Sequence, residues 1–328
     1  MIATVRTGDD LQSVIDHAPD AGGIILLQEG DHVLTQTLRL RSGIVLRGKD
    51  RVSSRLVILQ RAPKPARAYA EVPDDWTVGV LFQKIAHAGL EHLTVIYDPS
   101  LPVPVAPALG PATYVDDAGG RDNLHVISVA FAGAQDCWLT QCFITNAGSH
   151  PLMISDSRHL TVRNLGINGT HNRGPGSGQV GLFRSEHVLF DQVTLRDINN
   201  CVIHTDLIAQ PCRYNVITDS RFEVDLRLHG AGTRDNLIER TAIAVPPWLE
   251  RTPLSPGNAK AHEPPPGAGN LLFLCTVTRD FASGQRAFSM ADNPNLIYQV
   301  LQRHAREREP SVEIFAPAQA LGSLRLGP

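Results

Sequence analysis

The sequence lacks an excess of positive charge. It has 30 Lys and Arg residues against 33 Asp and Glu residues, which gives a formal net charge of −3 over 328 residues. A nucleic-acid-binding domain would carry a basic stripe or a strongly basic composition, so no nucleic-acid partner is indicated. Lysine is scarce as well, since Lys260 is the only one beyond the first third of the chain. A cation that takes part in chemistry in the middle of the chain must therefore be Arg or His.

Long apolar runs and paired cysteines are also absent. No run of about 18 apolar residues is present, so neither a transmembrane helix nor a membrane partner is predicted. The five cysteines contain no Cys-x-x-Cys pair and are scattered along predicted strands, as is typical of buried reduced thiols. The chain does not begin with the basic-then-apolar pattern of a signal peptide, which predicts a cytoplasmic protein. A secreted protein whose signal has been removed would show the same sequence, so secretion stays the alternative.

What the sequence does contain is a repeat of short strands. The 27 glycines and 23 prolines divide the chain into short runs in which apolar residues alternate. From residue 122 onward, successive segments share one layout: a short strand, a polar turn and a second strand. The alignment rests on apolar residues spaced 21 to 28 positions apart, namely Ile127, Ile154, Leu182, Ile203 and Leu226. Periods of this length predict a solenoid, and the short, uneven strands favour a β-solenoid over a propeller.

The N-terminal segment narrows the fold class. Residues 11–18 carry apolar side chains at the spacing of one helix face, and Asp9 or Asp10 is placed to cap that helix. Residues 23–48 follow as short strands, with the patterns "GGIILL" and "SGIVLRG". This segment resembles the entry to a right-handed parallel β-helix of the pectin-lyase-like superfamily, in which a short amphipathic helix caps the open end of the solenoid.

The resemblance covers residues 5–60 in their sequence pattern and residues 85–280 in the layout of their repeats. It implies a fold rather than one activity, because the superfamily includes polysaccharide lyases, glycoside hydrolases, uronate epimerases and phage tailspikes. The paired-aspartate and Gly-His-Gly patterns of polygalacturonases are missing, and so is the Trp-x-Asp-His stretch of pectate lyases.

We therefore expect an all-β chain, a single-stranded right-handed parallel β-helix that forms one domain over residues 1–328. Its expected parts are an N-terminal cap with a short helix (1–22), coils (23–290) and a C-terminal cap segment (291–328) with a helix after Pro294 and then a short strand. Three long loops are expected to leave the coils at one corner: 99–122, 168–178 and 246–269.

The register of the repeat predicts the functional residues. Stacked coils place equivalent residues about 4.8 Å apart. If Ile203 and Leu226 are equivalent inward residues, a two-by-two patch of polar residues forms on one outer face: His204, Asp206, Arg227 and His229. Asp206 would then lie beside His229 and orient its imidazole. Earlier coils carry uncharged residues at the equivalent positions, so the polar patch is expected to be confined to these two coils.

Residues around the patch are expected to bind the substrate. Loops of this length are usually functional, and the middle loop brings His171 as a further catalytic candidate. The candidate substrate-binding residues are Asp225, Phe183, Arg184, Arg173, Asn172 and Trp248. A groove with polar groups and an aromatic side chain is the usual way in which a sugar chain is held.

These residue types match β-elimination on an acidic, uronate-containing polysaccharide. Such a lyase needs a cation that neutralises the substrate carboxylate, a base for the C5 proton and an acid for the leaving O4. Arg227 can neutralise the carboxylate through a bidentate contact, and His204 or His229 can act as the base.

Other functions stay open. A glycoside hydrolase needs two carboxylates about 5–5.5 or 6.5–9.5 Å apart, whereas Asp206 and Asp225 would lie about 13 Å apart along the strand direction. A uronate C5-epimerase would use the same groups as the lyase, and a glycan-binding or tailspike-like β-helix is the non-enzyme alternative. No cofactor is expected, Ca²⁺ and assembly into a homo-oligomer are left open, and no metal is assigned because nothing fixes a ligand geometry.

Overall fold

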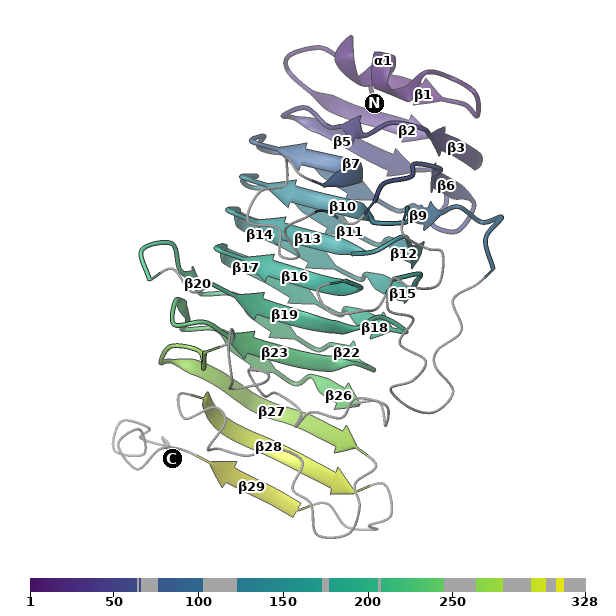
Figure 1. Cartoon of the computed structure of the whole chain (residues 1–328). Coiled ribbons are helices and arrows are strands. Elements are labelled where there is room, and N and C mark those ends of the chain that lie inside the picture. Colours follow the sequence, from purple (N-terminus) through teal and green to yellow (C-terminus); the bar gives the residue numbers. More distant parts are fainter. Residues whose placement is uncertain are drawn as a thin grey trace.

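The computed structural model describes residues 1–63, 65, 76–102, 123–172, 177–205, 208–244, 264–279, 296–304 and 311–315. Its strands stack in coils from the N-terminus at the top of Figure 1 to the C-terminal strands at the bottom. The pairing between successive coils is parallel, and each strand pairs with a strand about one coil away in the sequence. The expected all-β, single-stranded right-handed parallel β-helix is confirmed.

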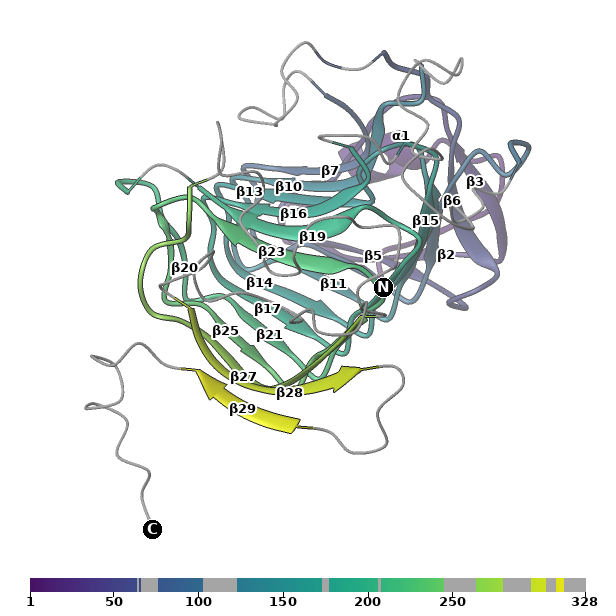
Figure 2. The same ribbon diagram turned by 60° about the horizontal axis from the view of Figure 1, so that its bottom comes forward.

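One side of the coils is a sheet of seven strands, which we call sheet B. Its strands in spatial order are β4 (Leu38–Arg39), β7 (Thr77–Gln83), β10 (Val126–Ala132), β13 (Leu152–Ser155), β16 (Gln179–Phe183), β19 (Asn200–His204) and β23 (Asp225–His229). Figure 2 shows them stacked on the side opposite β14, β17, β21 and β25.

The other two sides belong to one sheet of 22 strands, which we call sheet A. Its first ladder contains β1 (Ala3–Val5), β2 (Gly23–Leu27), β5 (Ile44–Gly48), β8 (Gly89–Glu91), β11 (Trp138–Thr140), β14 (Arg158–Arg163), β17 (Glu186–Asp191), β20 (Cys212–Arg213), β21 (Val216–Thr218), β24 (Thr233–Arg234) and β25 (Leu237–Glu239). Its second ladder contains β3 (Gly30–Leu34), β6 (Ser54–Ile58), β9 (Thr94–Tyr97), β12 (Phe143–Ala147), β15 (Gly166–Thr170), β18 (Thr194–Arg196), β22 (Arg221–Phe222) and β26 (Ala242–Ala244). Both ladders meet on the long strand β27 (Asn270–Arg279).

Alternation along each strand builds the core. In sheet B the inward column runs through Val80, Val129, Leu152, Val180, Cys201 and Leu226, all of which belong to the main buried cluster. Successive side chains of a strand point to opposite faces, so the residues between these positions face outward. Full burial of one aliphatic side chain is worth about 1.5–3 kcal/mol, so the stacked apolar columns hold consecutive coils together.

The N-terminal end carries a short helix, α1 (Leu11–Asp16). The carboxylate of Asp10 caps it by accepting a hydrogen bond from the Ser13 backbone N–H at 3.0 Å. Leu11 and Ile15 are buried in the main core cluster, because they share the apolar face of the helix. This is the only helix among the described residues, and it is too short to span a membrane.

The expectation of a C-terminal helix after Pro294 is wrong. Residues Leu296–His304 form strand β28, which pairs in parallel with β27, and β29 (Ser311–Phe315) pairs antiparallel with β28. The edge of β27 offers a row of backbone donors and acceptors, and pairing with such an edge outweighs the weak helix preference of a short segment. The long-range pairing of β28 with β27 therefore decided the structure of this segment.

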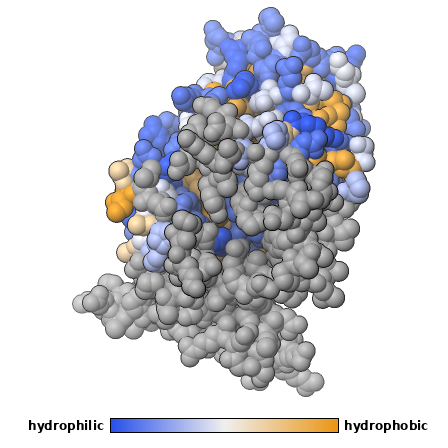
Figure 3. Space-filling view, viewed as in Figure 1, coloured by the Kyte–Doolittle hydropathy of each residue, from blue (hydrophilic) through white to orange (hydrophobic). Residues whose placement is uncertain are grey.

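The expected long loops lie mostly outside the described residues. Of the middle one, residues 168–170 are the end of β15, so any loop there begins after Thr170. Where the N-terminal coils are visible at the top of Figure 3, their surface is largely hydrophilic with scattered apolar side chains. Isolated apolar residues on a surface are ordinary.

The five cysteines are buried free thiols, as the sequence predicts. Burial raises the pKa of Cys142, Cys201 and Cys212 to about 12 and that of Cys275 to about 11. Since the thiolate is the reactive form, we expect no cysteine of the folded protein to react with a thiol reagent such as dithionitrobenzoate at pH 8. All five should react once guanidinium unfolds the chain. A thiol that reacts in the folded protein as fast as free cysteine would contradict the packing of the core described above.

Candidate functional site

The segment 225–229 is strand β23, the last strand of sheet B. Leu226 and Leu228 belong to the main core cluster. Asp225, Arg227 and His229 therefore lie on the outer face, spaced about 7 Å apart along the strand. They are nevertheless buried, with 0%, 4% and 2% of their surface exposed. A carboxylate, a guanidinium and an imidazole thus share one face of one strand, away from bulk water.

The predicted register between β19 and β23 is wrong by two residues. Ile203 pairs with Leu228 rather than with Leu226, and Leu226 pairs with Cys201. A shift of two keeps every side chain on its own face, so the alternation that predicted the faces could not reveal it. The repeat alignment also misplaced Ile127, because the partner of Ile154 on β10 is Phe131.

The corrected register changes which residues meet. Arg227 lies beside Val202 instead of His204, and His229 lies beside His204 instead of Asp206. Asp206 itself lies outside the described residues, so the expected contact between Asp206 and His229 stays a prediction. The two-by-two patch is replaced by a pair of histidines, with Arg227 two residues before one of them.

The imidazoles of His204 and His229 are stacked. Their ring centroids are 4.0 Å apart and their planes are inclined by 29°. Nδ1 of His204 lies 3.1 Å from the backbone oxygen of His229. Because a carbonyl oxygen only accepts, His204 donates from Nδ1, and the lone pair of its neutral form is on Nε2. Two imidazolium charges this close repel each other, so the pair holds one proton more readily than two.

Phe183 lies in the same outward column as the two histidines, since it pairs with His204. Its ring meets that of His204 edge-on at 6.0 Å. His204 is partly exposed, whereas Phe183 and His229 are buried. The histidine pair can therefore be reached by solvent from the His204 side.

A second outward column places Asp225 beside Asn200, which in turn lies beside Gln179. All three are buried. The charge of Asp225 contributes, after burial, to the raised pKa of the Cys201 thiol on the neighbouring strand. A buried carboxylate needs a compensating charge or hydrogen bonds, and Arg227 is the cation that its own strand offers on this face. Gln179 and Asn200 were missed by sequence reasoning, which would have needed the correct register to find them.

Other predicted residues lie elsewhere. The Arg184 guanidinium binds Asp156 at 2.8 and 3.0 Å in the turn that follows β16. His171 lies before β16, where its backbone N–H bonds Ala147 and its ring meets Tyr97 at 5.8 Å. Phe183 and the histidine pair are at the far end of the strand, about 13 Å away from its start.

Asn172 is also part of that corner, because its side chain donates to the Gly148 carbonyl at 2.9 Å. The structure therefore does not bring His171 and Asn172 to the histidine pair. Arg173 and Trp248 lie outside the described residues.

The coils that precede the site carry apolar residues on the same outer face. The column that ends at Arg227 runs through Leu81, Ala130, Met153, Gly181 and Val202. These side chains, glycine excepted, belong to a second buried cluster that is separate from the core. The earlier coils thus carry apolar residues in this column, and this part of the face is buried rather than an open groove. Among the described residues, no group of three or more His, Cys, Asp or Glu could hold a metal ion.

No protein-family model and no curated protein sequence matches the chain. Several solved structures do match the chain. The pectin methylesterase of Erwinia chrysanthemi is 15% identical, with 98% of this chain and 95% of that chain covered and a TM-score of 0.46. A family 28 exopolygalacturonase of Yersinia enterocolitica is 12% identical, with 93% and 70% covered and a TM-score of 0.47. The endo-xylogalacturonan hydrolase of Aspergillus tubingensis is 10% identical, with 86% of each chain covered and a TM-score of 0.49.

These structures are pectin-lyase-like right-handed parallel β-helix proteins, as the N-terminal resemblance implied. They are carbohydrate-active enzymes, one esterase and two hydrolases. Their identities to this chain are so low that the likeness concerns the fold alone. The roles of residues are therefore inferred from this chain's own geometry.

Proposed function

We propose that the protein is a polysaccharide lyase that cleaves a uronate-containing glycan by β-elimination at the outer face of β19 and β23. The observation that carries the proposal is that His204 on β19 stacks on His229 on β23, with their rings 4.0 Å apart, and that β23 also carries Arg227. Proton removal and proton delivery need two titratable groups near neutral pH, and histidine is the side chain that titrates there.

Arg227 and the two histidines each have one role in this reaction. The positive charge of the buried Arg227 guanidinium neutralises the substrate carboxylate, which makes the C5 proton more acidic. The neutral imidazole of the pair takes that proton. The electron pair left at C5 forms the C4–C5 double bond, the bond between C4 and O4 breaks, and the protonated imidazole delivers a proton to O4. A pair that holds one proton more readily than two supplies both forms at once.

Hydrolysis has less support from the described residues. A glycoside hydrolase needs two carboxylates that flank the scissile bond. On the outer face of the described strands of sheet B, Asp225 is the one carboxylate, and its partners in the column are the amides Gln179 and Asn200. The second acid considered from the sequence, Asp206, lies outside the described part of the chain.

The proposal is tested by incubating the protein with a panel of acidic polysaccharides, namely polygalacturonate, alginate and a glycosaminoglycan. We expect absorbance of the new double bond to appear with one of them, at a rate that depends on protein concentration. New reducing ends without that absorbance would make the protein a hydrolase. Inversion at C5 without cleavage would make it an epimerase, and binding without any product would make it a glycan-binding protein. Each of these three results would overturn the lyase proposal.

A further inference from the structure

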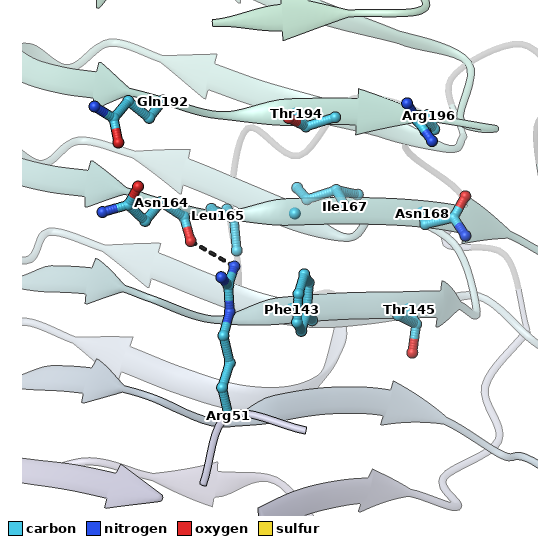
Figure 4. Close-up of a pocket in the computed structure, with 11 residues that line it drawn as sticks. Arg51, Phe143, Thr145, Asn164, Leu165, Ile167, Asn168, Gln192, Thr194 and Arg196 are labelled. Carbon is cyan, nitrogen blue, oxygen red and sulfur yellow. Dashed lines mark hydrogen bonds between the residues drawn. The ribbon is translucent and has the colours of Figure 1, made fainter. Parts of the chain in front are cut away.

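A second groove lies on a different face of the coils, on the outer side of sheet A. It has a volume of about 390 Å³ and is lined by residues of strands β12, β15 and β18, by residues just before β15 and β18, and by Arg51 (Figure 4). The inward neighbours Ile144, Ile167 and Leu195 belong to the core, so the residues that alternate with them face the groove. It has no residue in common with the site on sheet B.

The floor of the groove consists of two outward columns. Phe143, Gly166 and Thr194 form one, and Thr145, Asn168 and Arg196 form the other. The columns are about 7 Å apart and three coils span about 10 Å, which is the footprint of one or two sugar rings. The volume falls within the ~300–1,000 Å³ range of small-molecule sites.

Gly166 makes room between its two neighbours. A Cβ at this position would come within 2.7 Å of Cδ1 of Phe143. The ring of Phe143 therefore lies against β15, where a side chain would otherwise stand. The other side of the ring is covered by Arg51, whose guanidinium carbon is 3.7 Å from the ring centroid. Arg51 reaches over from the turn between β5 and β6 and donates to the carbonyls of Cys142 and Asn164, at 2.8 and 2.7 Å.

The chemistry of the lining points to one class of ligand. Five lining side chains carry amides or hydroxyls, which both donate and accept: Thr145, Asn164, Asn168, Gln192 and Thr194. Neighbouring sugar hydroxyls need both kinds of partner. Among the described residues that line the groove, Arg51 and Arg196 are cationic and none carries a carboxylate. A guanidinium can bind a carboxylate through two parallel hydrogen bonds.

Arg196 is the cation available to a ligand. It is half exposed and its contact with Glu223, at 2.9 Å, involves one of its terminal nitrogens. Glu223 is also held by Arg221 at 3.0 Å, so this carboxylate keeps a partner when Arg196 turns to a ligand. Arg51, by contrast, is held by the two carbonyls and contributes mainly its charge.

From these features we infer that the groove on sheet A is a binding site for an acidic saccharide, a hexuronate unit whose carboxylate is bound by Arg196 and whose hydroxyls are bound by the amides and threonines. The inference does not depend on the proposed lyase activity, because the groove shares no residue with the histidine pair. On one molecule the two sites would bind two stretches of an acidic glycan.

The test is calorimetric titration of the full chain with two probes, D-galacturonate and D-galactose, which differ in the carboxylate. We expect galacturonate to bind more tightly than galactose. Charge-assisted hydrogen bonds to the carboxylate are lost in Arg196→Gln, so the dissociation constant for galacturonate should rise about tenfold. Thr194→Trp, which places a large side chain over the floor, should abolish binding to this groove, so that only binding to the site on sheet B remains.

Arg163→Gln is the matched control. Arg163 is an equally exposed arginine of sheet A, in an ion pair of its own with Asp191 at 2.7 Å, and it does not line the groove. This variant should bind galacturonate as the wild type does. Equal binding of galactose and galacturonate, an unchanged dissociation constant in Arg196→Gln, or an equal loss of binding in Arg163→Gln would overturn the inference. Whether polysaccharide is cleaved is measured separately, so the two proposals can fail independently.

Discussion

Replacing His229 with glutamine is expected to slow the formation of unsaturated product by about 10²–10⁴-fold, the usual contribution of a positioned acid or base. Glutamine keeps a polar side chain of similar size on the buried outer face of β23, and the backbone oxygen that His204 contacts remains in place. The loss should appear in kcat with little change in KM, because the imidazole moves a proton in the transition state and does not bind the glycan in the ground state. His204→Gln should have an effect of the same order.

The pH profile adds a second readout. With one imidazole as base and the other as acid, the wild type should show a bell-shaped dependence of kcat on pH, and either variant should lose one limb of the bell. His187→Gln serves as the control, because His187 is an exposed histidine of β17, whose ring stacks on Tyr214 at 5.3 Å. It should keep both the rate and the bell. Wild-type turnover in both His204→Gln and His229→Gln would exclude the histidine pair as the acid and base.

Replacing Asn236 with leucine is expected to lower the free energy of unfolding by about 3 kcal/mol, because several buried polar groups lose their partners at once. Asn236, Asn215 and Asn270 form a ladder across three coils. Oδ1 of Asn236 accepts from Nδ2 of Asn215 at 2.9 Å, and Nδ2 of Asn236 donates to Oδ1 of Asn270 at 2.9 Å and to the Cys212 carbonyl at 3.0 Å. Leucine has a similar volume but supplies none of these bonds.

This ladder matters for the site, because it joins the coil that contains β19 to the coil that contains β23. Its loss should loosen the two coils that hold His204 and His229. The stability is measured by urea denaturation, as a shift in the midpoint at constant slope. Asn168→Ala is the control, since the Asn168 side chain is exposed on β15, and it should change stability by less than about 0.5 kcal/mol. Equal midpoints for the two variants would mean that the ladder does not hold the coils.

The alternation in "VDLRLHG" was sufficient to predict which residues of β23 face the core and which face outward. The same pattern could not define the pairing of that strand with β19. Shifts by two positions bury the same leucines and differ only in which outward residues become neighbours. The choice depends on the lengths of the segments that separate the strands, and residues 206–207, between β19 and β20 in the sequence, are not among those described. The histidine pair was therefore present among the predicted residues, but in the wrong arrangement.

Other features depended on contacts that a single sequence does not contain. Strand β28 forms because it pairs with the edge of β27, and no local sequence pattern predicts that pairing. The groove on sheet A is made by Gly166 and by Arg51, which is more than a hundred residues away in the sequence but donates to the carbonyl of Asn164. By contrast, the cap of α1 at Asp10 and the burial of the cysteines follow from local composition and spacing, and both could be predicted.

The central claim is that His204 and His229 carry out β-elimination on a uronate. It is tested most directly by the proton NMR spectrum of the product that the wild type forms from the polysaccharide it turns over, recorded beside that of the His204→Gln, His229→Gln double variant. We predict a vinyl H4 signal of the C4–C5 double bond that grows with time for the wild type and is absent for the double variant over the same period. Saturated ends without the vinyl signal from the wild type, or the vinyl signal at the wild-type rate from the double variant, would contradict the claim.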